Sequence, residues 1–292
     1  MSQATRQTRQ ISPIETPTEN YWLFTPEEVA ETPSRLDGIS YDLEARVIAK
    51  SAHFIHDAGR ALSVPQLTMS TACIFFQRFY MLEPMIDHHP PDVAVACLFL
   101  ACKTQETHKR LRDVIHWSHK VRTRNTKDFP DGHDLYEDSP GFFEEKNKVL
   151  DKERELLRVL NFDLTVDPPY RHMWLLAKTF LSSNPEIRTL LTQTAWNFLN
   201  DSFRSYLPIM YDSREIATAA LFLAAKMHDF ELPDGKGRNE RGERLKAWHE
   251  LFGCDLKRIT EIGNRILDIY DVETEQSNGV KKEIKMEEKV AK

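Results

Sequence analysis

An uncharged apolar run that occurs twice is the feature that most constrains this fold. Residues 93–103 read Val-Ala-Val-Ala-Cys-Leu-Phe-Leu-Ala-Cys-Lys, and residues 216–226 read Ile-Ala-Thr-Ala-Ala-Leu-Phe-Leu-Ala-Ala-Lys. A surface helix has one apolar stripe and one polar face, so a run that is apolar on every side predicts a helix enclosed by other helices. Pro90 and Pro91 suit the first turn of such a helix, and Lys103 suits its carboxyl end.

The two runs indicate an internal duplication. A shift of 123 residues, from Lys103 to Lys226, makes seven of the ten positions from 94 to 103 identical. The same shift superimposes three earlier residues on identical ones, Thr71, Ala72 and Phe75 on Thr194, Ala195 and Phe198. Agreement of two separate segments on one offset predicts two copies of a helical unit, each built around a central buried helix.

Composition narrows the class of protein. The chain has 292 residues, a net charge of −6 and a pI near 6.0, which argues against direct nucleic-acid binding because that needs a basic surface. No apolar run reaches the ~18 residues that span a bilayer, and the polar start resembles no secretory signal. The four cysteines lie in apolar runs without Cys-x-x-Cys pairs, so we expect core thiols in the cytosol or nucleus.

No motif for a cofactor, a metal or a catalytic group stands out. Neither phosphate-binding glycine pattern is present among the ten glycines. The histidine pairs at 53 and 56, 88 and 89, and 116 and 119 lack carboxylates or cysteines at ligand spacing. We therefore expect no cofactor, no metal site and no catalytic residue.

Helical periodicity predicts five helices in each half, and no segment shows a convincing strand pattern. In the first half they cover about 42–62, 66–82, the central run, 108–119 and 142–160; in the second, 167–181, 184–204, a helix from 213, 242–252 and 256–270. Thr25-Pro26-Glu27-Glu28 is a capping box that predicts a short helix after the aromatic cluster at 21–24. The chain should be all-α, with two tandem five-helix bundles.

These helices divide the chain into four parts. Residues 1–20 form a polar tail that we expect to be disordered, residues 21–162 the first bundle with its N-terminal helix, and residues 163–271 the second bundle. Residues 272–292 are a charged tail, also expected to be disordered. A polar loop from Arg122 to Gly141 has no role that the sequence predicts.

Glu153 is an anomaly in the last helix of the first half. It lies three residues after Leu150 and four before Leu157, inside an apolar stripe. A carboxylate buried there without a partner costs several kcal/mol, so either a cation pairs with it or the stripe opens onto a surface that another protein covers. Lys103 is the obvious cation. The second half repeats this lysine as Lys226, but its last helix has Ile262 or Gly263, depending on the register, at the position of Glu153. Only the first half therefore has both charges.

Spacing alone leaves two interpretations of this pair. Lys103 could simply interact with the dipole at the carboxyl end of its helix, and Glu153 could lie at the rim of the apolar stripe. Both residues would then be structural. Alternatively, the two charges anchor a partner through charge-assisted hydrogen bonds, while flanking apolar side chains supply contact area.

A known family carries both charges in this arrangement. The run ending in Lys103-x-x-Glu106, followed by Glu153-x-x-Leu-Leu157-x-x-Leu-Asn-Phe162-Asp-Leu164, resembles the cyclin box. The resemblance extends from about Trp22 to Tyr270 and is closest to transcriptional cyclins of types K and T. It rests also on residues 22–25, 33–35, 78–81 and 195–202.

The resemblance implies a function. It predicts a regulatory, non-catalytic subunit of a transcriptional cyclin-dependent kinase, with RNA polymerase II and its C-terminal repeat domain as the indirect target and the nucleus as the location. The residues it assigns to kinase contact are Lys103, Glu153, Phe99, Glu106, Leu157, Phe162 and Leu164. The kinase itself, whether a K-type or a T-type partner, is not predicted.

Three alternatives belong to other classes. A general transcription factor of the TFIIB type shares the doubled fold but brings a zinc ribbon and a basic surface. A cell-cycle cyclin would carry a Met-Arg-Ala-Ile-Leu docking patch, where this chain has Ala45-Arg46-Val47-Ile48-Ala49. An all-α enzyme would need polar residues converging in a pocket, and the polar residues here lie at helix ends and in loops.

Overall fold

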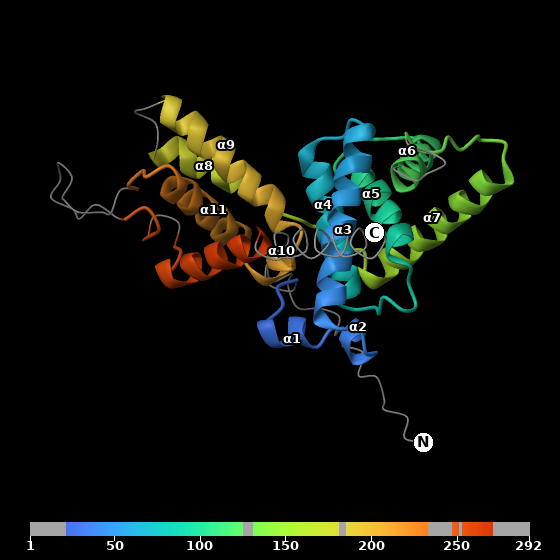
Figure 1. The fold of residues 1–292 in the computed structure, drawn as a ribbon, viewed down its shortest axis with the longest axis horizontal. Helices are drawn as coiled ribbons and strands as arrows, with labels where there is room; N and C mark the ends of the chain where they lie inside the picture. The colour runs from blue at the N-terminus through green and yellow to red at the C-terminus, as the bar shows by residue number, and fades with distance from the viewer. Residues whose placement is uncertain (1–21, 125–130, 181–184, 233–246, 251–252, 271–292) are drawn as a thin grey trace, which may run out of the picture.

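The computed structural model describes residues 22–124, 131–180, 185–232, 247–250 and 253–270. Within these ranges it contains α-helices and no β-strand. Figure 1 shows the helices in two groups that lie side by side, with the short N-terminal helices below their junction. The predicted all-α class is therefore confirmed. The two tails expected at 1–20 and 272–292 lie outside the described residues.

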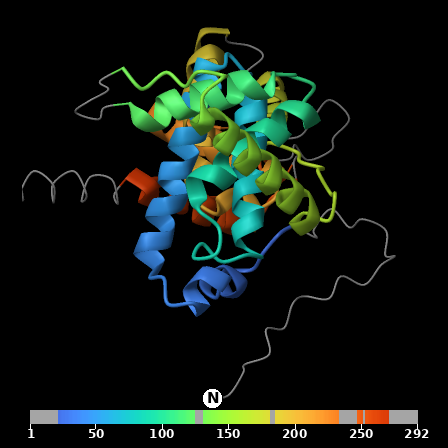
Figure 2. The same ribbon diagram turned by 90° about the vertical axis from the view of Figure 1, so that its right-hand side faces the viewer.

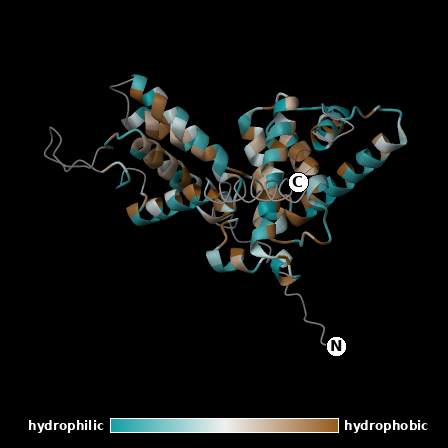
Figure 3. Cartoon of the chain, in the orientation of Figure 1, coloured by the Kyte–Doolittle hydropathy of each residue, from teal (hydrophilic) through white to brown (hydrophobic). Residues whose placement is uncertain are grey.

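The first group contains five long helices around the duplicated apolar run. They are α3 (Tyr41–Ala61), α4 (Gln66–Tyr80), α5 (Pro90–Thr104), α6 (Leu111–Thr123) and α7 (Pro140–Val159). Every residue from Val93 to Cys102 of α5 is buried, and α5 contacts α3, α4, α6 and α7. In Figure 3, α5 is mostly brown whereas α7 is largely teal, as expected for an enclosed helix and a peripheral one.

The second group repeats the plan with shorter elements. It contains α8 (Tyr170–Phe180), α9 (Pro185–Ser202), the short α10 (Leu207–Met210), α11 (Ser213–Met227) and a helix over residues 256–270. The helix predicted from 167 begins only at Tyr170, because Pro168 and Pro169 hold the preceding residues extended. Most of the helix predicted at 242–252 lies outside the described residues, and 247–250 are not α-helical. The sequence did not predict α10 or α2 (Pro33–Leu36).

The duplication extends to the backbone that ends the two central helices. Glu106 after α5 has φ +53° and Asp229 after α11 has φ +50°, and these positions differ by the same 123 residues. In both copies the next amide donates to the carbonyl five positions back, Thr107 to Cys102 at 2.9 Å and Phe230 to Ala225 at 2.8 Å. This left-handed C-cap satisfies carbonyls that the helix leaves without partners.

A side-chain contact is also repeated. Gln105 donates to the Thr71 hydroxyl at 3.2 Å, and at the equivalent positions His228 lies 2.8 Å from the Thr194 hydroxyl. Each contact ties the end of a central helix to the helix before it. Three-dimensional equivalence at the predicted offset supports descent of the two bundles from one unit.

The N-terminal segment joins the two groups. Trp22 donates from its indole nitrogen to Asp163 at 2.8 Å, and the guanidinium of Arg78 lies 4.7 Å from the centroid of the Trp22 rings. The amide of Phe24 donates to the Ile209 carbonyl at 2.8 Å, which ties the segment to α10. The helix α1 (Pro26–Ala30) follows with the predicted capping box. Trp22 and Phe24 are both buried, so these two aromatic residues pack on the main body.

A buried ion pair fixes α2 against α3. Glu44 has no exposed surface, and it accepts from Arg35 Nε and from the Thr32 hydroxyl, each at 2.6 Å. Sequence reasoning missed this carboxylate, because Glu44 occurs in the first turn of a helix where acidic residues are common. Arg46, in the segment that corresponds to the docking patch of cell-cycle cyclins, is exposed and donates to the Asp42 carbonyl of its own helix.

Polar side chains also cross the junction between the bundles. Gln66 of α4 donates to Tyr170 Oη at 3.2 Å and to Asn200 Oδ1 at 2.9 Å. Gln77 donates to the carbonyls of Phe203 and Ser205, both at 2.8 Å. These hydrogen bonds fix the orientation of the second bundle relative to the first, because amide and carbonyl groups buried at a contact must be paired there.

Because His56 is largely buried at this junction, we expect the folded chain to lose stability in acid. Burial, with help from Arg60 and His53, lowers the pKa of His56 to about 4, whereas an unfolded histidine titrates near 6.5. The unfolded chain therefore binds the extra proton first, and stability is lost as the pH falls from 6.5 through 4, by about 3 kcal/mol in total. Urea melts of His56→Gln should show a shallower loss over this range. The exposed His108→Gln is the control, and equal slopes for all three proteins would contradict the prediction.

Candidate partner-binding surface

The centre of the candidate site is an ion pair between α5 and α7. Lys103 Nζ lies 2.7 Å from Glu153 Oε1 and 2.9 Å from Oε2. The Glu153 side chain is 9% exposed and that of Lys103 is 47% exposed, so the carboxylate is satisfied inside the chain while the ammonium remains open to a second molecule. The predicted pairing is therefore confirmed, and the pair lies at the surface, within reach of another chain.

Phe99 supports this lysine. Lys103 Nζ lies 4.0 Å from the centroid of the Phe99 ring, at cation–π distance, and Phe99 itself is only 7% exposed. In this structure Phe99 therefore holds the ammonium over α5 and offers little contact area of its own. Glu106, the residue after the C-cap of α5, is exposed and makes no ion pair within the described residues.

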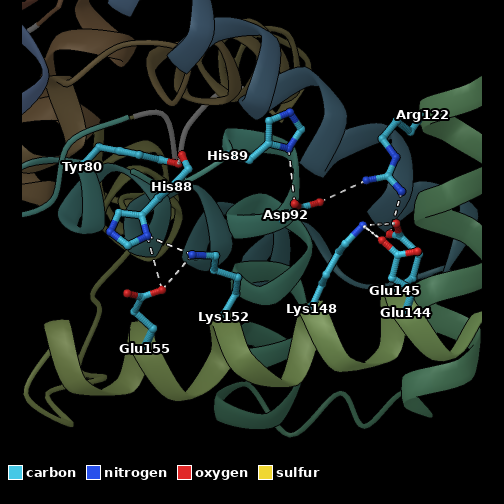
Figure 4. Close-up of polar contacts among 10 residues, drawn as sticks. All are labelled: Tyr80, His88, His89, Asp92, Arg122, Glu144, Glu145, Lys148, Lys152 and Glu155. Carbon is cyan, nitrogen blue, oxygen red and sulfur yellow. Dashed lines mark hydrogen bonds and ion pairs between the residues drawn. The ribbon is translucent and has the colours of Figure 1, made fainter. Parts of the chain in front are cut away.

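A belt of polar contacts holds α7 across the first bundle and so positions Glu153. Figure 2 looks onto this side of the molecule, and Figure 4 shows the belt in detail. Arg122 of α6 bridges two other helices, donating to Asp92 of α5 at 3.3 Å and to Glu145 of α7 at 2.7 Å. Because the Arg122 guanidinium donates to both α5 and α7, it restricts the direction of α7 relative to α5 as well as the distance between them.

The second half of the belt centres on His88, just before α5. Lys152 Nζ of α7 lies 2.9 Å from His88 Nδ1 and 2.8 Å from Glu155, and Tyr80 donates to the His88 carbonyl at 2.8 Å. These contacts appear at the left of Figure 4. His88 thus has a packing role, and the structure finds no group of three or more potential ligands for a metal in the part of the chain it describes.

Phe162 lies in a strained turn at the end of α7, the helix that carries Glu153. It is 73% exposed, and both Phe162 and Asn161 have positive φ, of 57° and 51°. The amide of Phe162 donates to the Leu157 carbonyl at 3.0 Å, which closes α7 and fixes this geometry. A bulky residue in the left-handed region is a genuine outlier, and such strain concentrates at binding sites. Leu157 and Leu164 are partly buried against the core on either side.

The second bundle repeats the lysine without its carboxylate. Lys226 lies 5.6 Å from the centroid of Phe222, as Lys103 lies over Phe99. The helix over 256–270 places the buried Ile262 and Gly263 against α11, and a side chain at Gly263 would contact Leu223. Within the described residues Lys226 makes no ion pair, so the charge pair is confined to the first bundle as predicted.

Sequence reasoning missed two features of the exposed phenylalanines. Phe142 is buried at the start of α7 while its neighbour Phe143 is 53% exposed, and two adjacent phenylalanines give no pattern that separates them. The strain at Phe162 has no sequence signal either, because positive φ is usually inferred from glycine or asparagine.

No helix among the described residues is both long and apolar enough to cross a bilayer.

Comparison with known proteins identifies the family of this chain. The model of the family described as Cyclin, N-terminal domain, matches residues 21–165. Cyclin pch1 of Schizosaccharomyces pombe is 31% identical over 249 residues, which cover 85% of this chain and 68% of that protein. Cyclin-T1-5 of Arabidopsis thaliana is 33% identical over 252 residues, which cover 86% of this chain and 41% of that protein.

A solved structure shares the fold. A chain of the yeast RNA Pol II CTD kinase CTDK-1 complex matches with a TM-score of 0.67 and 22% identity, over 85% of this chain and 72% of that one. The chain spans only about two-fifths to one-half of the length of the plant cyclins it matches. The relatives include cyclins of the T, K and L types, and these do not favour a TFIIB-like factor or a cell-cycle cyclin. The chain therefore belongs to the cyclin family, with relatives among the T, K and L types and pch1.

Proposed function

We propose that this chain is the activating, non-catalytic subunit of a cyclin-dependent kinase that phosphorylates the C-terminal repeat domain of RNA polymerase II, and that it acts in the nucleus. The observation that carries the proposal is the half-exposed Lys103, held by Glu153 and Phe99. The exposed Phe162 follows at the end of α7, the helix that carries Glu153. A chain of similar fold occurs in the yeast RNA Pol II CTD kinase CTDK-1 complex, and this supports a kinase as the partner.

The surface would act by selecting one kinase conformation. A partner helix that carries a carboxylate would accept from Lys103, while Phe162, Leu157 and Leu164 cover its apolar face. A shift from mostly inactive to mostly active kinase requires about 5 kcal/mol of differential binding. The belt around Arg122 and His88 makes the surface rigid, so little of the binding energy is lost in ordering it. All catalytic groups would belong to the kinase.

The decisive experiment is identification of the partner. The chain is tagged at its natural locus, purified, and its stoichiometric companions are identified by mass spectrometry. The purified complex is then assayed for phosphate transfer to a polymerase C-terminal repeat peptide. A companion kinase with this activity is expected. A stoichiometric complex that lacks any protein kinase would overturn the proposal.

Replacing the strained phenylalanine separates binding from folding. Phe162→Gly should weaken kinase binding about tenfold, because an exposed aromatic anchor is lost. The melting temperature should stay the same or rise slightly, because glycine relieves the positive φ although it adds freedom to the unfolded chain. Calorimetric titration with the kinase and thermal melts measure the two effects. Phe143→Ala removes another exposed phenylalanine while keeping a residue that favours the helix α7, and it is the control for the binding measurement. A Phe162→Gly protein that melts several degrees lower would show that Phe162 is structural.

A further inference from the structure

A groove lies between α8 and α9 of the second bundle. Trp174, Ala177 and Lys178 of α8 line one side, and Arg188, Thr192 and Trp196 of α9 line the other. Its volume is about 440 Å³, within the range of sites that bind small molecules or short peptide segments. In Figure 1 these two helices lie at the left, whereas α5 and α7 lie at the right.

The groove is cationic on a chain that is acidic overall. Lys178 and Arg188 face it from different helices, and neither forms an ion pair within the described residues. Arg171 lies on the same exposed side of α8, three residues before Trp174 and seven before Lys178. With a net charge of −6 for the whole chain, an uncompensated basic cluster of this kind indicates an anionic ligand.

Lys120 of the first bundle lies beside a tryptophan as Lys178 does, but it differs in having a carboxylate partner. Lys120 Nζ lies 5.7 Å from the centroid of Trp117, much as Lys178 Nζ lies 5.2 Å from Trp174. Lys120, however, also donates to Asp134 at 2.9 Å, so its charge is neutralised within the chain. The described structure provides no such carboxylate for Lys178.

The aromatic residues add a second recognition element. Trp174 is 58% exposed, and Trp196 is held in place by Tyr170, whose ring centroid lies 4.5 Å away. Flat aromatic surfaces in a groove are the usual binding sites for proline-containing extended peptides. Cations beside aromatic surfaces therefore match a peptide with both a phosphate and a neighbouring proline.

We propose that this groove binds a phosphorylated, proline-containing segment of the repetitive substrate of the kinase, an inference that rests on the function proposed above. A serine or threonine phosphate would accept from Lys178 and Arg188, while the adjacent proline ring packs on Trp174. Single-stranded nucleic acid fits less well, because it needs a continuous track of cations along its backbone and α8 and α9 offer only a short cluster.

The consequence is retention of a partly modified substrate. Once one repeat is phosphorylated and bound by the second bundle, its neighbours are tethered near the kinase at a raised effective concentration. Phosphorylation of one repeat would thereby favour phosphorylation of the next, with no change in the catalytic site.

The test measures peptide binding by the full-length chain without any kinase. Fluorescence anisotropy follows a labelled peptide of two polymerase C-terminal repeats, either unmodified or carrying phosphoserine before proline. The phosphorylated peptide should bind at least about tenfold more tightly. The double variant Lys178→Glu, Arg188→Glu should remove this difference, and Trp174→Ala should weaken both peptides. Lys257→Glu and Trp117→Ala, on other surfaces, should leave binding unchanged.

Three outcomes would overturn the proposal. They are equal affinity for the two peptides, a phosphopeptide affinity that survives the double charge reversal, and displacement of the phosphopeptide by single-stranded RNA at lower concentration than by unlabelled phosphopeptide. Circular dichroism and the milder pair Lys178→Ala, Arg188→Ala guard against unfolding. Because Lys103 and Glu153 are intact in every groove variant, kinase co-purification remains a separate measure of the proposed function.

Discussion

Replacing both Lys103 and Glu153 with alanine is expected to remove most of the kinase that co-purifies with this chain, while the protein still folds. A desolvated, charged anchor at the centre of an interface contributes at least about 2 kcal/mol, or roughly thirtyfold in affinity. The fold should tolerate the change because the double variant removes both charges together and leaves no buried carboxylate without a cation. Quantitative pull-down and thermal melts measure the two effects.

The single variants make this experiment sharper. Lys103→Ala leaves the Glu153 side chain, which is only 9% exposed, without its cation, and should cost about 1–3 kcal/mol of stability. The swap Lys103→Glu with Glu153→Lys restores an ion pair but reverses the charge presented to the partner, so it should fold and fail to bind. Lys226→Ala is the matched control in the second bundle. A double alanine variant that unfolds would assign the pair a structural role.

Glu44→Ala is expected to produce the largest loss of stability. The Glu44 carboxylate is completely buried and accepts from Arg35 and Thr32. Its removal leaves a guanidinium that is 13% exposed without its carboxylate, and the buried Thr32 hydroxyl without its acceptor. Breaking a buried pair from one side costs about 3–5 kcal/mol. For a domain of this size that corresponds to a melting temperature lower by roughly 10 °C.

Matched variants distinguish charge from packing at this position. Glu44→Gln retains an acceptor for Thr32 and should lose less, whereas Arg35→Met combined with Glu44→Leu replaces both charges with apolar side chains and should recover much of the stability. Urea and thermal melts compare the three proteins with the wild type. A Glu44→Ala protein that melts within a degree of the wild type would show that water reaches the pair.

The helices were largely predictable because their signals are local. Proline at the start of α5, the Thr25 capping box and the uncharged run of α5 each act within a few residues, and the observed bounds lie close to those predicted. The errors have local causes as well. The short α2 and α10 contain too few residues to show a helical period, and paired prolines delay the start of α8.

Part of the candidate site was predictable for a different reason. The duplication provides an internal comparison, and a carboxylate present opposite only one of two equivalent lysines identifies Glu153 without any structure. The role of Phe99 was less well predicted, because its exposure of only 7% depends on how the neighbouring helices pack around α5. Contact of these residues with a kinase stays a prediction.

The order of residues in this chain was enough to establish that it is helical, that it is doubled, and that one half carries a charge pair the other lacks, because each of these properties depends on periodicity or on comparison within the chain. The strained exposure of Phe162, the buried Glu44 pair and the cationic groove between α8 and α9 emerge only when the helices are packed. Burial, backbone strain and uncompensated charge depend on contacts between residues distant in sequence, and local patterns contain no information about those contacts.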